Sequence, residues 1–157
     1  MMYKSYTVEE AKKKLEYYCA YQERCHDEVF QKLKELNMIP QAIDIIIVYL
    51  IENNFLNEER FACSFARGKF RIKQWGKKRI TNELKARNIS NYNINKALKE
   101  IPEEEYFETF QKLVAKEWEG NPESNIRKKK KKIMDFLLRK GYESNIVLDA
   151  VYSLPEK

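Results

Sequence analysis

The sequence predicts an all-α protein in which three tandem three-helix repeats stack into an elongated, curved array. The chain of 157 residues holds only four glycines and four prolines, too few for the many tight turns of a β-sandwich or barrel. One apolar pattern with helical spacing recurs three times along the chain. Because a single three-helix unit buries little apolar surface, neighbouring units are expected to stack. A compact nine-helix globule is the alternative.

The first helix of each repeat has a start signal and one apolar side. Thr7 and Glu10 form a T-x-x-E capping box, the second such helix is expected to begin near Asn57, and the third follows Pro102 and an acidic first turn. The sides predicted to be buried are Ala11, Leu15 and Tyr18, then Phe61, Phe65 and Ala66, and then Phe107, Phe110, Leu113 and Val114.

The middle helices are anchored on Leu33, Leu84 and Leu137, each preceded by a β-branched residue one helical turn earlier. One turn after each anchor comes a residue that tolerates the left-handed conformation closing a helix. These pairs are Val29 and Asn37, Ile80 and Asn88, and Ile133 and Gly141.

The third helices repeat apolar residues at steps of three, one and three, which describe one side of an α-helix. The predicted sets are Ile43, Ile46, Ile47 and Leu50, then Ile94, Ala97, Leu98 and Ile101, and then Val147, Ala150, Val151 and Leu154. We expect repeat boundaries at residues 1–53, 54–101 and 102–157, with a loop at 120–122 inside the third repeat.

A net charge of +6 and a sequence pI near 9.1 make nucleic acid, or a protein bound to it, a plausible partner. Two basic tracts occupy equivalent places before the middle helices of the second and third repeats, and stacking is expected to align them as a stripe. A solvated charge run with no ligand is the alternative. The candidate binding residues are Lys69, Arg71, Lys73, Trp75, Lys77, Lys78, Arg79 and Lys85, together with Arg127, Lys128, Lys129, Lys130, Lys131 and Lys132.

Helical spacing assigns the residues of the first tract to two sides of a helix. Ile80 and Leu84 define a core side, which turns Lys78 and Lys85 to the opposite, open side. Residues 69–73 are expected in a short linker between helices. Trp75 has three roles open to it: stacking on a base, inserting into a protein pocket, or packing over the following helix start, which we favour.

Three stretches carry a resemblance that covers nearly the whole chain. They read YCAYQERCHDEVFQKLKELN (residues 18–37), FLNEERFACSFARGKFRIKQWGKKRITNELKARNIS (55–90) and KKKIMDFLLRKGYESNIVLDAV (130–151). In this order they resemble the RecX family, the bacterial regulators of the RecA recombinase. The chain departs from many members at Arg24-Cys25, where they carry Arg-Ser, and in the length of its basic run at 127–132.

The resemblance implies a modulator that lies in the groove of the RecA–DNA filament, limits filament growth and inhibits RecA in DNA repair and recombination. It implies contact with DNA through the filament, no catalytic activity and no cofactor. We expect a cytoplasmic monomer. The competing hypothesis is a stand-alone helical module that binds DNA through phosphate contacts and does not need RecA.

An enzyme is the third hypothesis, and the residue inventory argues against it. The single histidine, His26, excludes a two-histidine metal site, and Cys19, Cys25 and Cys63 lack CxxC spacing, so no metal or catalytic site is predicted. The cysteines are expected to be reduced thiols. The longest apolar tract, residues 42–51, is too short for a membrane helix.

Overall fold

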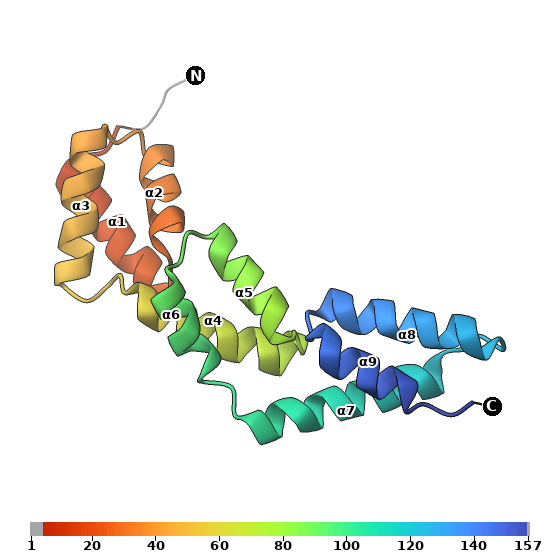
Figure 1. Ribbon diagram of the computed structural model, residues 1–157. Coiled ribbons are helices and arrows are strands. Elements are labelled where there is room, and N and C mark those ends of the chain that lie inside the picture. Colours follow the sequence, from red (N-terminus) through yellow and green to blue (C-terminus); the bar gives the residue numbers. More distant parts are fainter. Residues whose placement is uncertain (1–4, 157) are drawn as a thin grey trace.

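The computed structural model describes residues 5–156, in which nine α-helices account for all the regular structure (Figure 1). We call α1–α3, α4–α6 and α7–α9 the first, second and third units. The helices are α1 (Val8–Tyr21), α2 (His26–Glu35), α3 (Pro40–Glu52), α4 (Glu58–Lys73), α5 (Lys77–Ala86), α6 (Asn91–Leu98), α7 (Glu103–Gly120), α8 (Ile126–Lys140) and α9 (Ser144–Tyr152).

The three units follow one another in a bent, elongated body, with the first and third units at opposite ends (Figure 1). The middle helices α2, α5 and α8 run along the inner side of this bend, and α7 lies on the outer side. The all-helical repeat array is therefore confirmed, and the compact globule is not formed. The predicted boundaries fall in the links between α3 and α4 and between α6 and α7; as limits of separate domains they stay a prediction.

The three middle helices end in the same way at the level of single atoms. Asn37, Asn88 and Gly141 have φ angles of 60°, 60° and 101°, in the left-handed region. The backbone N–H of the next residue then donates to the carbonyl of the anchor leucine, which is the six-residue bond of a Schellman motif. These bonds are Met38 to Leu33 (3.1 Å), Ile89 to Leu84 (3.1 Å) and Tyr142 to Leu137 (3.2 Å).

Side chains fix the starts of several helices. The predicted capping box forms, with Glu10 N–H donating to Thr7 Oγ1 at 3.1 Å and Thr7 N–H to the Glu10 carboxylate at 3.0 Å. The Asn57 side chain accepts from the N–H of Arg60 at the start of α4, as its position in the sequence predicts.

The buried apolar residues form two clusters. One belongs to the first unit and includes Leu15, Leu33 and Leu50, all fully buried. The other runs without a break through the second and third units, and it takes in Cys25 from the start of α2. The second and third units therefore share one core, whereas the first unit is joined to them mainly through Cys25 and polar contacts.

Phe107 and residues 69–73 do not lie where the sequence predicts. Phe107 is 52% exposed, and its neighbour Tyr106, only 4% exposed, packs against Phe70 and Tyr142 instead. The expected linker at residues 69–73 is the last part of α4, which ends at Lys73 and is followed by Gln74, a left-handed residue with φ 57°. Gln74 is not a typical residue for that conformation, so the sequence carries no clear signal that α4 continues to Lys73.

Candidate functional site

The first basic tract lies on the end of α4 and on α5, and α5 runs along the inner side of the bend (Figure 1). Ile80 and Leu84 are completely buried, so α5 turns its opposite side to solvent. Lys78 and Lys85 are exposed on that side, which confirms the prediction from helical spacing that both lysines lie opposite the core.

The second tract is part of α8 and does not precede it. Asn125 caps this helix by accepting from the N–H of Lys128 at 3.1 Å, so Arg127–Lys132 form the first turns of the helix. Because consecutive helical residues point in different directions, the six cations do not lie on one side. Four of them are exposed, whereas Lys129 and Lys130 are half-buried.

Acidic neighbours offset some of the positive charge. Four candidate residues form ion pairs of the surface type, which stabilise a fold weakly but lower the local potential. The pairs are Arg71–Glu105 (3.6 Å), Lys130–Glu156 (3.3 Å), Lys131–Asp135 (3.2 Å) and Lys132–Glu123 (4.0 Å). Arg71 therefore points toward α7, on the outer side of the body, and is not part of the inner surface.

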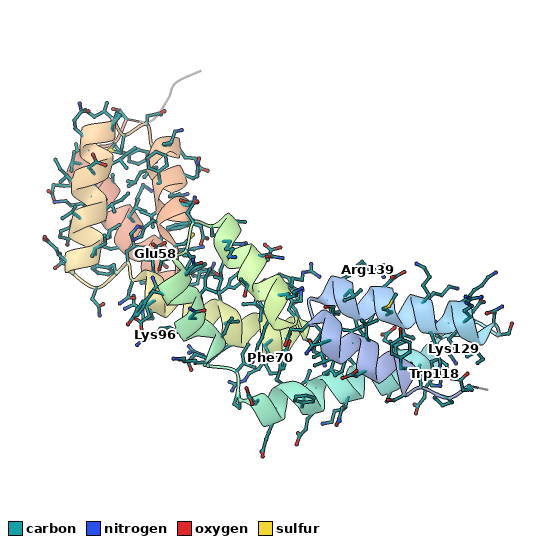
Figure 2. The ribbon with its side chains drawn as sticks, viewed as in Figure 1. Glu58, Phe70, Lys96, Trp118, Lys129 and Arg139 are labelled. Carbon is teal, nitrogen blue, oxygen red and sulfur yellow. The ribbon has the colours of Figure 1, made fainter. Side chains whose placement is uncertain are left out.

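Aromatic rings hold four further candidates. The Trp75 ring packs against Phe65 with centroids 6.2 Å apart, which places it over the local core as favoured from the sequence. The cations lie over rings: Lys69 Nζ at 5.1 Å and Arg79 Cζ at 4.3 Å from Trp75, Lys77 Nζ at 4.7 Å from Tyr106, and Lys129 Nζ at 4.1 Å from Trp118 (Figure 2).

Five candidates keep their charged ends available. Within residues 5–156, the side chains of Lys73, Lys78, Lys85, Arg127 and Lys128 form no ion pair, hydrogen bond or ring contact, and all five are exposed. We call Lys78, Lys85, Arg127 and Lys128 the inner cations, because they belong to the two basic helices on the inner side of the bend (Figure 1).

The end of α8 meets the start of α5 through backbone hydrogen bonds. Gly76 N–H donates to the Lys140 carbonyl at 2.7 Å, and Lys78 N–H donates to the Gly141 carbonyl at 2.9 Å. A Cβ atom on Gly76 would lie 2.3 Å from the carbonyl carbon of Gly141. These bonds satisfy N–H groups that a helix start leaves without partners inside the helix.

Side chains close the same junction. Tyr142 O–H donates to the Gln74 carbonyl at 2.9 Å, and Lys77 N–H donates to Tyr106 Oη at 3.0 Å while the Tyr106 hydroxyl bonds the Glu143 carboxylate. Burial raises the pKa of both tyrosines well above the usual value. The junction thus fixes α5 relative to α8. The sequence did not predict this junction, because a glycine such as Gly76 or Gly141 is typical of any helix end and does not indicate a contact with another helix.

The first and second units meet through polar contacts. His26 N–H, at the start of α2, donates to the carboxylate of Glu58 at 3.4 Å, and Asn88 Nδ2 donates to Asp27 at 2.8 Å. Glu58 lies at the start of α4 (Figure 2). His26 is therefore a helix-start residue, as its position predicts.

The three thiols are poor candidates for nucleophiles. Burial raises the pKa of both Cys19 and Cys25 to about 11, so the reactive thiolate is scarce at neutral pH. Cys63 is partly exposed, and burial together with the nearby Glu100 carboxylate raises its pKa as well.

None of residues 5–156 belongs to a helix that is long and apolar enough to cross a membrane.

Thiol labelling should report this burial directly. At pH 8, we expect a disulfide reagent to modify Cys63 slowly and to leave Cys19 and Cys25 unmodified, since both are at most 5% exposed. In denaturant all three thiols should react, and Cys63→Ser should abolish the native signal. Rapid native labelling of the Cys63→Ser variant would contradict the buried positions of the other two.

Family models match more than half of the chain. The second three-helix domain of RecX matches residues 57–98, and the third three-helix domain of RecX matches residues 103–151. Among curated proteins, the regulatory protein RecX of Bacillus cytotoxicus is 24% identical over 140 residues, which span 89% of this chain and 52% of that protein. The regulatory protein RecX of Lactococcus lactis subsp. cremoris is 32% identical over 142 residues, 86% of this chain and 52% of that protein. The chain thus spans about half the length of these relatives.

Solved structures share the fold over almost the whole chain. The crystal structure of RecX from Lactobacillus salivarius superposes with a TM-score of 0.81 at 26% identity, covering 94% of this chain and 96% of that one. A second crystal structure of a regulatory protein RecX has a TM-score of 0.76 at 23% identity, with 94% and 74% covered, and shows the likeness of fold alone. Family domains, relatives and fold agree: this chain belongs to the RecX family, whose relatives described above are named regulatory proteins.

Proposed function

We propose that this protein is a non-enzymatic modulator of the RecA recombinase, which binds the groove of the RecA–DNA filament, inhibits RecA and thereby regulates DNA repair and recombination. Membership of the RecX family supports the partner. In this proposal the protein works in the cytoplasm, as a monomer whose contact with DNA is made through the filament.

The observation that carries the proposal is the set of inner cations on a rigid support. Lys78 and Lys85 on α5, and Arg127 and Lys128 on α8, are exposed and have no partner within residues 5–156. The junction at Gly76 and Gly141 fixes these two helices relative to each other. Positive groups held in fixed positions suit a polyanion whose phosphates repeat along a filament.

Lys73, at the end of α4, is exposed and adds to the positive potential beside α5, and the other candidate residues have narrower roles in this proposal. Lys69, Lys77, Arg79 and Lys129 are held over rings, where they keep their charge and add to the positive potential around the inner cations. Trp75 supports them by packing over the start of α5. Arg71 and Lys130–Lys132, which are paired with carboxylates, contribute less.

Binding measurements separate this proposal from a stand-alone DNA-binding module. Affinity for single-stranded DNA, for RecA and for the RecA–DNA filament should be compared at two salt concentrations. We expect the filament to bind most tightly at both. Binding to bare DNA that equals binding to the filament, with a steep loss of affinity in salt, would favour the stand-alone module and contradict the filament proposal.

A further inference from the structure

A groove of about 640 Å³ lies between α1 and α2 of the first unit, away from the basic tracts of the other two units. Four tyrosines line it: Tyr6, Tyr17, Tyr18 and Tyr21. Tyr17 and Tyr21 are 78% and 77% exposed, one helical turn apart on α1. Aromatic side chains usually bury most of their surface, so two adjacent rings left open to solvent indicate a contact surface.

The core of the first unit explains why these rings face outward. Ala11, Leu15 and Cys19 form the buried line of α1. Tyr17 and Tyr21 each lie two residues beyond a member of that line, which turns them about 200° away from it. Neither ring belongs to the buried core of the first unit.

Positive groups surround the rings. Lys13, Lys14, Arg24 and Lys32 also line the groove, and no carboxylate within residues 5–156 lines it with them. Glu28 and Glu35 lie beside it and pair with Arg24 and Lys32, each at 3.8 Å. Lys13 and Lys14 have no acidic partner in the part of the chain that the structure describes, and Lys14 Nζ lies 5.0 Å from the ring centroid of Tyr6, where it keeps its charge. The groove is therefore suited to an anion.

One side of the groove is already held in place. The Arg24 guanidinium stacks on Tyr18, with its Cζ atom 3.7 Å from the ring centroid, and its Nε–H donates to the Tyr18 carbonyl at 2.9 Å. Arg24 Cζ also lies 6.0 Å from the ring centroid of Tyr21. A planar group that enters between these side chains meets a fixed cation and two aromatic rings.

We propose that this tyrosine groove binds single-stranded nucleic acid, whose bases stack on Tyr17 and Tyr21 and whose phosphates contact Lys13 and Lys14. Aromatic rings alternating with cations are the chemistry by which proteins hold single strands without sequence preference. A duplex keeps its bases stacked on one another and would leave the rings unused. An acidic peptide would use the cations, but it offers few planar groups to open tyrosine rings.

The test is fluorescence-anisotropy binding of the full chain to a labelled oligothymidylate of about 16 nucleotides, which is the upper end of common site sizes. An abasic deoxyribose-phosphate strand of equal length carries the same charge without bases. We expect tighter binding to the oligothymidylate. Tyr17→Ala/Tyr21→Ala should weaken it by about tenfold or more and leave the abasic strand unaffected, because stacking depends on bases.

The matched control is Tyr92→Ala/Tyr152→Ala, which removes two tyrosines of similar exposure, 64% and 76%, from the other units. It should bind as wild type does. Repeating the comparison in a Lys78→Gln/Lys85→Gln/Lys128→Gln background removes phosphate contacts at the inner cations, and the preference for bases should persist there. The result is independent of RecA, so failure of filament binding would not affect it.

Equal affinity for the abasic strand and the oligothymidylate would overturn the proposal, as would unchanged oligothymidylate binding by folded Tyr17→Ala/Tyr21→Ala. Binding of a polyglutamate peptide that depends on Tyr17 and Tyr21, without binding of the oligothymidylate, would also overturn it and assign the groove to an acidic protein segment.

Discussion

Replacing Gly141 by alanine should lower the free energy of unfolding by about 3 kcal/mol or more, through positive-φ strain and overpacking together. Gly141 has φ 101°, and a Cβ atom there would lie 2.3 Å from Arg79 Cβ and 2.5 Å from its backbone nitrogen. The backbone of α5 cannot yield without breaking the bonds from Gly76 and Lys78. Gly76→Ala should behave similarly, since its Cβ would meet the backbone of Gly141.

Two variants separate the causes. Gly141→Asn relieves much of the strain, because asparagine tolerates a left-handed backbone, as Asn37 and Asn88 do at the equivalent positions. It retains the collision with Arg79 and should still destabilise strongly. Gly68→Ala, in the interior of α4 with nothing within 4 Å of its Cβ position, should stabilise by about 0.5–1 kcal/mol. Urea unfolding followed by circular dichroism measures all of these variants. A Gly141→Asn variant as stable as wild type would contradict the close contact between α5 and α8.

Neutralising three inner cations should raise the concentration needed to inhibit RecA by about tenfold or more, the equivalent of about 1.4 kcal/mol. The variant is Lys78→Gln/Lys85→Gln/Lys128→Gln, in which each side chain is exposed and without a partner in residues 5–156. Loss of three phosphate contacts should also lower the salt slope of filament binding by about 2. Stability should change little, because no buried group is touched.

The control removes the same charge elsewhere. Lys99→Gln/Lys112→Gln/Lys116→Gln changes three exposed lysines at the end of α6 and on α7, the outer helix (Figure 1). It should inhibit RecA as wild type does. If both triple variants lose the same activity, net charge and not the inner surface determines binding.

The repeated pattern made most of the architecture predictable. Leu33, Leu84 and Leu137, with their left-handed closing residues, mark the middle helices, and the structure reproduces even their terminal hydrogen bonds. Such signals are local, since helix ends and apolar spacing depend on residues a few positions apart.

Contacts between units were not predictable in this way. Gly76 and Gly141 are distant in the sequence, and only packing of the second unit against the third shows that each excludes a side chain from the other. The sequence prediction placed Phe107 in the core and not Tyr106, because the two residues are adjacent and both aromatic. The partners that let Tyr106 enter the core are Lys77 N–H, at the start of α5, and Glu143, just before α9, and both are distant from it in the sequence.

The candidate site could be predicted only in outline. Helical spacing placed Lys78 and Lys85 on the open side of α5, where they are exposed. Which cations keep their charge free depends on neighbours such as Glu123, Asp135 and Trp118, whose positions relative to the cations follow from the folded chain. Arg71 could not be excluded from the inner side until its contact with Glu105 was known.

The most direct test of the central claim is ATP hydrolysis by RecA on single-stranded DNA in the presence of the purified wild-type chain. We expect hydrolysis to fall as the chain is added toward stoichiometric amounts. Undiminished hydrolysis with chain that circular dichroism shows to be helical and cooperatively folded would contradict it.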